Sequence, residues 1–127
     1  MRFHHIGYLT HNLNKTTNYF KKLKYKKFQS LIIDKNFKVK IQFLKNGNNT
    51  LELIKPDAIN YGLTNILNQK IYAYHFAYKV KNLNKTISYL QKNFKLIVNP
   101  TPAKAFNGKK VAFLTLPDGF IIELIQS

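Results

Sequence analysis

The stretch Ile121-Ile122-Glu123-Leu124-Ile125 places one carboxylate among four aliphatic residues, and Leu51-Glu52-Leu53-Ile54 nearly repeats it upstream. Glu52 and Glu123 are the only glutamates among the 127 residues. Side chains alternate between the two faces of a strand, so both faces around each glutamate are apolar. An ionised carboxylate in such surroundings is costly unless a cation meets it. The two stretches therefore predict two buried glutamates that bind one cation.

Both glutamates belong to an internal repeat. Residues 5–26 align with residues 75–96 at an offset of 70, and the two glutamates align after a slip of one residue. The matching residues are His5 and His75, Tyr8 and Tyr78, Asn12-Leu13-Asn14-Lys15-Thr16 and Asn82-Leu83-Asn84-Lys85-Thr86, Tyr19 and Tyr89, Phe43 and Phe113, and Glu52 and Glu123. Self-similarity at a fixed offset indicates a duplicated module, so both halves should share one order of elements.

Each copy reads as a strand, a helix and three further strands, which predicts a βαβββ module. The expected strands are residues 3–10, 28–33, 39–44 and 50–54 in the first copy and 72–80, 96–98, 110–116 and 120–125 in the second. Asparagines suited to helix capping precede each helix, either Asn12 or Asn14 and either Asn82 or Asn84. Asn46-Gly47 and Pro117-Asp118-Gly119 predict turns between strands.

The modules span about residues 1–55 and 71–127, and residues 56–70 form a linker with a short helix at 63–67. No low-complexity segment separates them, so residues 1–127 should form one domain of the α+β class. No apolar run is long enough to cross a bilayer, and no signal peptide is visible, so we expect a cytoplasmic protein without a membrane partner. The lack of cysteine excludes disulfides and thiolate chemistry.

The net charge of +16 raises the question of nucleic-acid binding. However, lysine, asparagine, isoleucine and tyrosine are abundant together, which codon bias in an AT-rich genome produces. The lysines are dispersed, and the densest pairs, Lys21-Lys22 and Lys26-Lys27, suggest a solvated face. We therefore expect no nucleic acid as the main partner, and a weak preference for small molecules that carry phosphate.

The repeat distinguishes between two adjacent histidines. His5 aligns with His75, whereas His4 has no counterpart and is expected to be exposed, as is His11. Gly7 and Ala77 lie two residues further on, share the face of the histidine and are small. Space for a bound molecule is therefore expected beside each ring.

His5, Glu52, His75 and Glu123 form two His/Glu pairs, spaced by 47 and 48 residues. A lone strand histidine is usually a hydrogen-bonded core residue, and a lone buried glutamate can pair with a lysine. Four such residues at symmetric positions instead favour one divalent metal ion, such as Zn, Co, Ni or Mn. The aromatic residues at Tyr8, Tyr78, Phe43 and Phe113 are predicted to belong to the core.

With these motifs in place, the chain resembles the vicinal oxygen chelate superfamily, which includes glyoxalases, bleomycin resistance proteins and dioxygenases. The matching motifs are His5-Ile6-Gly7-Tyr8, His75-Phe76-Ala77-Tyr78, both Asn-Leu-Asn-Lys-Thr segments, Leu51-Glu52-Leu53-Ile54-Lys55-Pro56 and Ile122-Glu123-Leu124. The resemblance implies two tandem βαβββ modules that form one incomplete β-barrel with helices outside. It also implies the same four metal ligands and a homodimer.

Residues 102–114, followed by Asp118-Gly119, are most similar to small bacterial proteins related to methylmalonyl-CoA epimerase. This likeness implies a metal-dependent epimerase or isomerase that acts on a small acyl thioester, such as a CoA thioester, or on a 2-oxo compound. Its metal would stabilise the enolate formed when a neighbouring C–H is deprotonated.

Three acidic residues are candidates for the catalytic base. Glu123 could loosen from the metal, and Glu52 is its symmetric counterpart. The epimerases carry a further glutamate just before the strand that corresponds to residues 39–44, where this chain has Asp34. Asp34 either substitutes for that glutamate with a shorter side chain or is a turn residue.

Other functions stay open at this level. A lactoylglutathione lyase would use similar ligands, although nothing marks a glutathione site. A non-catalytic small-molecule binding protein is a further alternative, which the complete ligand set disfavours.

Overall fold

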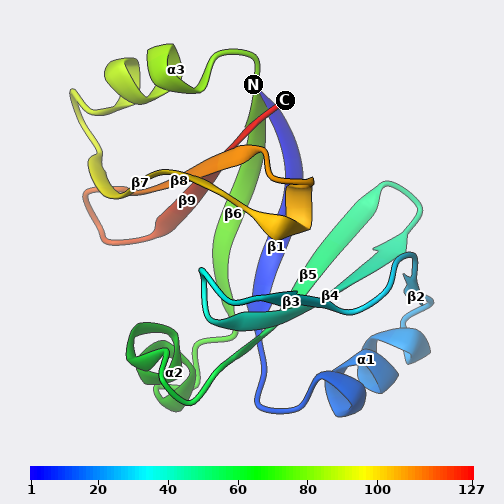
Figure 1. The fold of residues 1–127 in the computed structure, drawn as a ribbon. Coiled ribbons are helices and arrows are strands. Elements are labelled where there is room, and N and C mark those ends of the chain that lie inside the picture. The colour runs from blue at the N-terminus through cyan, green and yellow to red at the C-terminus, as the bar shows by residue number, and fades with distance from the viewer. The chain divides into compact units, whose positions relative to one another are not determined.

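The computed structural model describes residues 1–127 and contains three α-helices and nine β-strands. In chain order the elements are β1 (Arg2–Leu9), α1 (Leu13–Lys22), β2 (Lys26–Lys27), β3 (Ile32–Asp34), β4 (Val39–Asn46), β5 (Asn49–Pro56), α2 (Tyr61–Asn68), β6 (Ala73–Val80), α3 (Leu83–Leu90), β7 (Lys95–Pro102), a 3₁₀ helix (Lys104–Phe106), β8 (Lys110–Thr115) and β9 (Ile121–Gln126) (Figure 1). Both halves have the predicted βαβββ order, with β2 and β3 together in one strand position, and α2 lies in the predicted linker.

The elements form two compact units. The N-terminal unit comprises His5–Tyr74, and the C-terminal unit comprises His75–Ser127 together with Met1–His4. Strand β1 therefore contributes residues to both units. The prediction that the whole chain is one domain stays a prediction.

Ring contacts attach the first four residues to the C-terminal unit. The ring of Phe3 lies edge-on to Phe76 and Tyr78, with centroids 6.1 and 5.6 Å apart. His4 was expected to be exposed, but it is half-buried, because the ring of Phe106 lies edge-on to it at 5.6 Å. The sequence could not show this contact, since 102 positions separate the two rings.

In the N-terminal unit the strand order is β2-β4-β5-β1, and β3 also pairs with β4. β1 and β5 are parallel, whereas the other pairs are antiparallel. The predicted turn at Asn46-Gly47 is confirmed: Asn46 faces Asn49 in the ladder, and Gly47 has a φ of +58°. Glycine adopts this left-handed conformation without steric cost.

The single strand expected at residues 28–33 is wrong. Two short strands, β2 and β3, pair with β4 on either side of a break, because four residues on this side face only Gln42 and Phe43. The Gln42 side chain donates a hydrogen bond of 2.9 Å to the Gln29 carbonyl. A side-chain hydrogen bond thus connects β4 to the chain at this bulge, where the backbone ladder is interrupted.

Asparagine side chains start the helices. Asn12 and Asn82, rather than the alternatives at positions 14 and 84, each accept a hydrogen bond of 3.0 Å from the backbone N–H of Lys15 and Lys85. The linker helix α2 is longer than expected, because Asn60 caps it in the same way. None of the three helices is long and apolar enough to cross a membrane.

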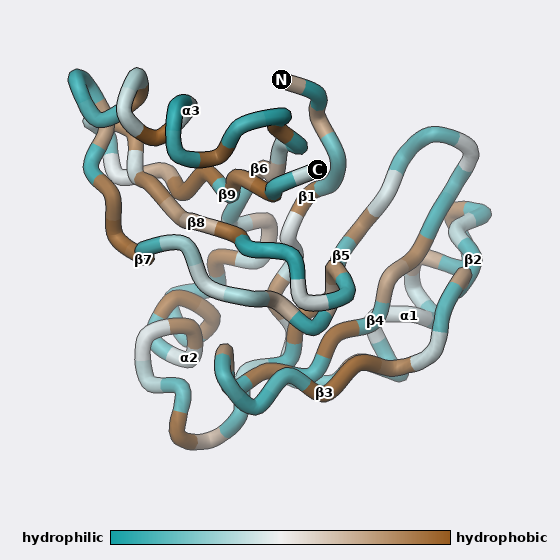
Figure 2. Tube along the Cα trace, turned by 45° about the horizontal axis from the view of Figure 1, so that its top comes forward, coloured by the Kyte–Doolittle hydropathy of each residue, from teal (hydrophilic) through white to brown (hydrophobic).

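Helix α1 packs on one face of its sheet, where Leu13 and Phe20 meet the buried residues Leu44, Leu51 and Leu53. The C-terminal unit repeats this arrangement with the strand order β6-β9-β8-β7. Its core cluster consists of Val80, Leu83, Ile87, Ala112, Leu114, Ile122 and Leu124. Figure 2 shows hydrophobic residues recurring along β8 and β9, whereas α3 alternates between hydrophilic and hydrophobic residues. In each unit one sheet face is thus covered by a helix, and the alternate side chains point to the other face.

Candidate metal centre

The first His/Glu pair lies on that other face of the N-terminal unit. β1 and β5 run parallel with Gly7 opposite Glu52, so His5, two residues before Gly7, shares the face of the glutamate. The distance between His5 Nε2 and Glu52 Oε1 is 3.2 Å. His5 is 0% exposed and Glu52 4% exposed. The sequence therefore predicted correctly that this glutamate is buried among aliphatic neighbours.

The second pair reproduces the first in the C-terminal unit. Ala77 on β6 lies opposite Glu123 on the parallel strand β9. His75 Nε2 lies 3.2 Å from Glu123 Oε1, and both residues are buried. The small residues Gly7 and Ala77 thus occupy equivalent ladder positions next to each glutamate.

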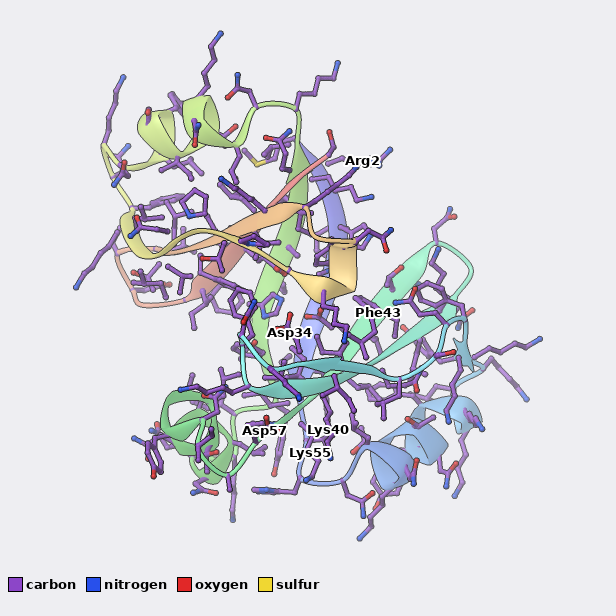
Figure 3. All side chains as sticks on the ribbon, in the orientation of Figure 1. Arg2, Asp34, Lys40, Phe43, Lys55 and Asp57 are labelled. Carbon is purple, nitrogen blue, oxygen red and sulfur yellow. The ribbon has the colours of Figure 1, made fainter.

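An aromatic ring also contacts each histidine. Phe43 and Phe113 lie opposite Glu52 and Glu123 in the antiparallel ladders. The ring of Phe43 lies edge-on to His5 at 5.8 Å and 86°, and that of Phe113 lies edge-on to His75 at 5.7 Å and 84°. Figure 3 shows Phe43 on one side of β4 and Lys40 on the other, as strand alternation requires.

The geometry of each pair fits two ligands of one metal ion. With metal–ligand bonds of about 2.1 Å, two ligand atoms lie about 3.0 Å apart at right angles and about 3.4 Å apart at the tetrahedral angle. The observed 3.2 Å falls between these values, and it is also the upper end of the range for a hydrogen bond. The donor set of buried imidazole and carboxylate therefore suits a divalent cation such as zinc, and could hold one.

Comparison with known proteins bears on the origin of this site. Residues 4–113 match the model of the Glyoxalase/Bleomycin resistance protein/Dioxygenase superfamily. The chain belongs to this superfamily. The predicted family is thereby confirmed, together with the α+β, glyoxalase-like fold of two βαβββ modules whose sheet is open. The comparison with curated proteins found no match.

Several solved structures share the fold. The hypothetical protein BH1468 from Bacillus halodurans has a TM-score of 0.85 at 23% identity, over 99% of this chain and 94% of the other. Methylmalonyl-CoA epimerase from Mycobacterium tuberculosis has a TM-score of 0.79 at 15% identity, over 98% and 87%. A methylmalonyl-CoA epimerase variant from Streptomyces coelicolor, in complex with 2-nitronate-propionyl-CoA, has a TM-score of 0.80 at 19% identity, over 100% and 94%. At these identities the likeness shows the fold alone.

Asp34, the third candidate for a catalytic residue, lies at the end of β3 and is buried. Its Oδ1 accepts hydrogen bonds from the backbone N–H groups of Asn36 and Phe37, at 3.0 and 3.1 Å. These hydrogen bonds are those of a residue that organises a turn. A catalytic role for Asp34 stays a prediction.

The sequence missed the position of Phe43 and Phe113 relative to the histidines. Both were expected simply to fill the core, and Phe43 is indeed 2% exposed. The available signal was the repeat itself, which aligns the two phenylalanines at the same offset as the two histidines. Ladder register then explains the contact, because each phenylalanine lies directly opposite a glutamate of the pair.

Proposed function

We propose that His5, Glu52, His75 and Glu123 hold one divalent metal ion, and that the protein is a metal-dependent epimerase or isomerase. The observation that carries this proposal is the pair of buried His/Glu contacts at 3.2 Å, at repeat-related positions of the two modules. A pair alone supplies only two protein ligands, whereas zinc sites in proteins have three or four. One ion shared by both pairs satisfies this requirement, and two carboxylates balance its charge.

The bound ion would act as a Lewis acid that polarises a carbonyl or thioester carbonyl of the substrate. Glu123 would loosen from the ion and accept the proton from the carbon next to that carbonyl, and Glu52, loosened in its turn and protonated by solvent, would return one to it. Inversion at carbon requires an acid/base group for each face, and the duplicated fold supplies one glutamate per module.

The proposed substrate is a small acyl thioester, such as a CoA thioester, or a related 2-oxo compound. Two features support this class. Methylmalonyl-CoA epimerases share the fold, and one was solved with a CoA-linked ligand. The net charge of +16 also attracts anionic substrates electrostatically.

Metal content tests the ligand set. Elemental analysis should find about one divalent ion per chain after loading with Zn, Co, Ni or Mn, and a chelator should remove it. Glu52→Gln and Glu123→Gln should each lower the metal affinity at least about tenfold, because an amide oxygen carries no charge. Asp57→Asn is the matched control, since it makes the same change outside the site. A chain that binds no metal under any loading condition contradicts the proposal.

Isotope exchange tests the reaction. With saturating metal, the protein should exchange the α-proton of methylmalonyl-CoA for deuterium, as mass spectrometry measures. Glu123→Gln should still bind the substrate but lose about 10²-fold or more in turnover, because a positioned base contributes about that much. Undiminished turnover in this variant would rule out Glu123 as the base. If the loaded protein instead consumes the adduct of methylglyoxal and glutathione, it is a lyase.

A further inference from the structure

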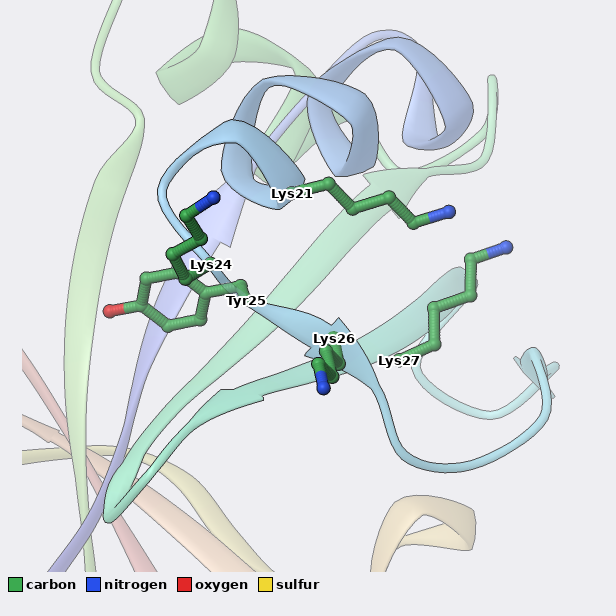
Figure 4. A pocket seen from close by; sticks show the side chains of 5 residues that line it. All are labelled: Lys21, Lys24, Tyr25, Lys26 and Lys27. Atoms are coloured by element: carbon green, nitrogen blue, oxygen red, sulfur yellow. The ribbon is translucent and has the colours of Figure 1, made fainter.

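A basic pocket lies at the end of α1 and along the edge strand β2, entirely within the N-terminal unit. It is an open pocket with a volume of about 400 Å³, lined by Lys21, Lys24, Tyr25, Lys26 and Lys27 (Figure 4). We refer to it as the lysine pocket. In Figure 4 the nitrogen ends of Lys21 and Lys27 lie on the same side, whereas the side chains of Lys24 and Lys26 point in other directions. The sequence predicted only a solvated face here.

The charge of this pocket has no local acidic counterpart. Residues 21–27 include five lysines and no acidic residue. The next acidic residue along the chain, Asp34, accepts hydrogen bonds within its own turn. Lys26 also lies directly opposite Lys45 in the ladder, and like charges at opposite positions destabilise a sheet. The pocket therefore concentrates positive charge at a cost to folding.

The second module does not repeat this concentration. Lys27 faces Leu44, and Leu96 faces the equivalent Leu114, so the ladders align Lys27 with Leu96. By the same register, Tyr25, Lys26 and Lys24 correspond to Phe94, Lys95 and Asn93, and at the repeat offset of 70 Lys21 corresponds to Gln91. Only one of the four lining lysines is thus a lysine in the other copy.

The base of the pocket is held by the fold. The ring of Tyr25 lies edge-on to Phe20 at 5.6 Å, and its N–H donates to the Phe20 carbonyl at 3.1 Å. Lys24 adopts a left-handed conformation with a φ of +71°, which reverses the chain after α1. The Asn46 side chain donates a hydrogen bond of 3.2 Å to the Leu23 carbonyl and so ties this turn to β4. The backbone that carries the lysines is therefore preorganised.

We propose that the lysine pocket binds a phosphate-bearing small molecule of nucleotide size, independently of the metal centre. Ligand pockets typically enclose about 300–1,000 Å³, which is more than a single phosphate fills. Lysine ammonium groups bind phosphate oxygens as point charges, and one phosphate monoester carries about −1.5 to −2. The ammonium groups of Lys21 and Lys27, which lie on the same side in Figure 4, thus suit a phosphate group, and the remaining lysines add positive charge around it. The Tyr25 ring and the methylene stems of the lysines provide apolar surface for the organic part of the ligand.

Calorimetric titration with ADP tests this proposal, with adenosine, inorganic pyrophosphate and a single-stranded oligonucleotide as parallel probes. ADP should bind the full chain, and the double variant Lys21→Gln with Lys27→Gln should weaken its affinity at least about tenfold through the loss of two unit charges. Lys22→Gln is the matched control, because Lys22 lies in the same last turn of α1 but does not line the pocket. It should change the affinity less than about twofold, since a charge that does not line the pocket lies further from the ligand and is screened by salt. Glu52→Gln should leave ADP binding intact, so failure of the metal centre and failure of this proposal are distinguishable.

Five results would overturn the proposal. ADP that does not bind at low salt removes the pocket as a ligand site. An equal loss of affinity in Lys22→Gln shows diffuse charge rather than a site. If adenosine binds as tightly as ADP, the phosphate groups contribute nothing to binding. If pyrophosphate binds as tightly as ADP, the organic part of the ligand contributes nothing. An oligonucleotide that competes far better than ADP, with a steep salt dependence, identifies the surface as one for nucleic acid.

Discussion

In the N-terminal unit, β1 and β5 hold a histidine 3.2 Å from a glutamate, and in the C-terminal unit β6 and β9 do the same. The two units differ at their edges. The edge strand β2 has two residues and leads into a bulge, whereas its counterpart β7 has eight residues and lines up along β8 with two register shifts. Buried positions tolerate little change because neighbouring side chains fill the space around them. Edge positions face solvent, so the two copies can diverge there.

Truncating one core residue in each unit tests whether the two units unfold in one cooperative transition. Leu53→Ala and Leu124→Ala each empty a position that is 0% exposed. Each should lower the free energy of unfolding by about 3 kcal/mol through lost burial and the cavity left behind. Urea titration followed by circular dichroism measures this.

Both leucine variants should shift one common unfolding transition, if residues 1–127 form one domain. Two transitions, each shifted by only one of the variants, would show that the two units unfold independently. Ile97→Ala, at an exposed position of β7, provides the control for loss of an aliphatic side chain without a cavity.

The helix caps offer a comparison of smaller size. Asn12→Ala and Asn82→Ala each remove a side chain that accepts a hydrogen bond at a helix N-terminus, so each should lower the free energy of unfolding by about 1 kcal/mol. Asn14→Ala, inside α1 and exposed, should be neutral or slightly stabilising because alanine has the higher helix propensity. A cost at position 14 equal to that at position 12 contradicts the assigned caps.

The smallest expected effect concerns Tyr8 in the N-terminal unit. Burial raises the pKa of the Tyr8 hydroxyl, and the neighbouring Tyr72, whose ring stacks at 6.0 Å, raises it further. The folded state therefore holds this proton more tightly than the unfolded chain, and stability falls as the pH rises above the ordinary tyrosine pKa of about 10. Tyr8→Phe should reduce the loss of stability measured by chemical denaturation between neutral and alkaline pH. An unchanged alkaline slope would show that Tyr8 contributes nothing to it.

Most of the fold could be predicted because its signals are local. Asn46-Gly47 and Pro117-Asp118-Gly119 lie at turns, and at the latter Gly119 N–H donates to the Leu116 carbonyl at 2.8 Å. The break at residues 28–31 could not be predicted, since it involves a hydrogen bond from the Gln42 side chain on β4 to the Gln29 carbonyl between β2 and β3. β7 is longer than the three residues expected, because antiparallel pairing with β8 extends it as far as Pro102. The side chains of these additional residues show no strand pattern that would have predicted the extension.

The sequence by itself determined the duplicated βαβββ order, the faces of the strands and the selection of His5 over His4, because period and repeat spacing are properties of the chain. Only the tertiary structure decided the 3.2 Å contacts, the edge-on rings of Phe43 and Phe113, and the lysine pocket. These features depend on ladder register and on packing between elements that are distant in sequence. Side-chain alternation, which the sequence shows, determines the face that a residue occupies. Strand pairing, which only the tertiary structure shows, determines the residue that lies next to it.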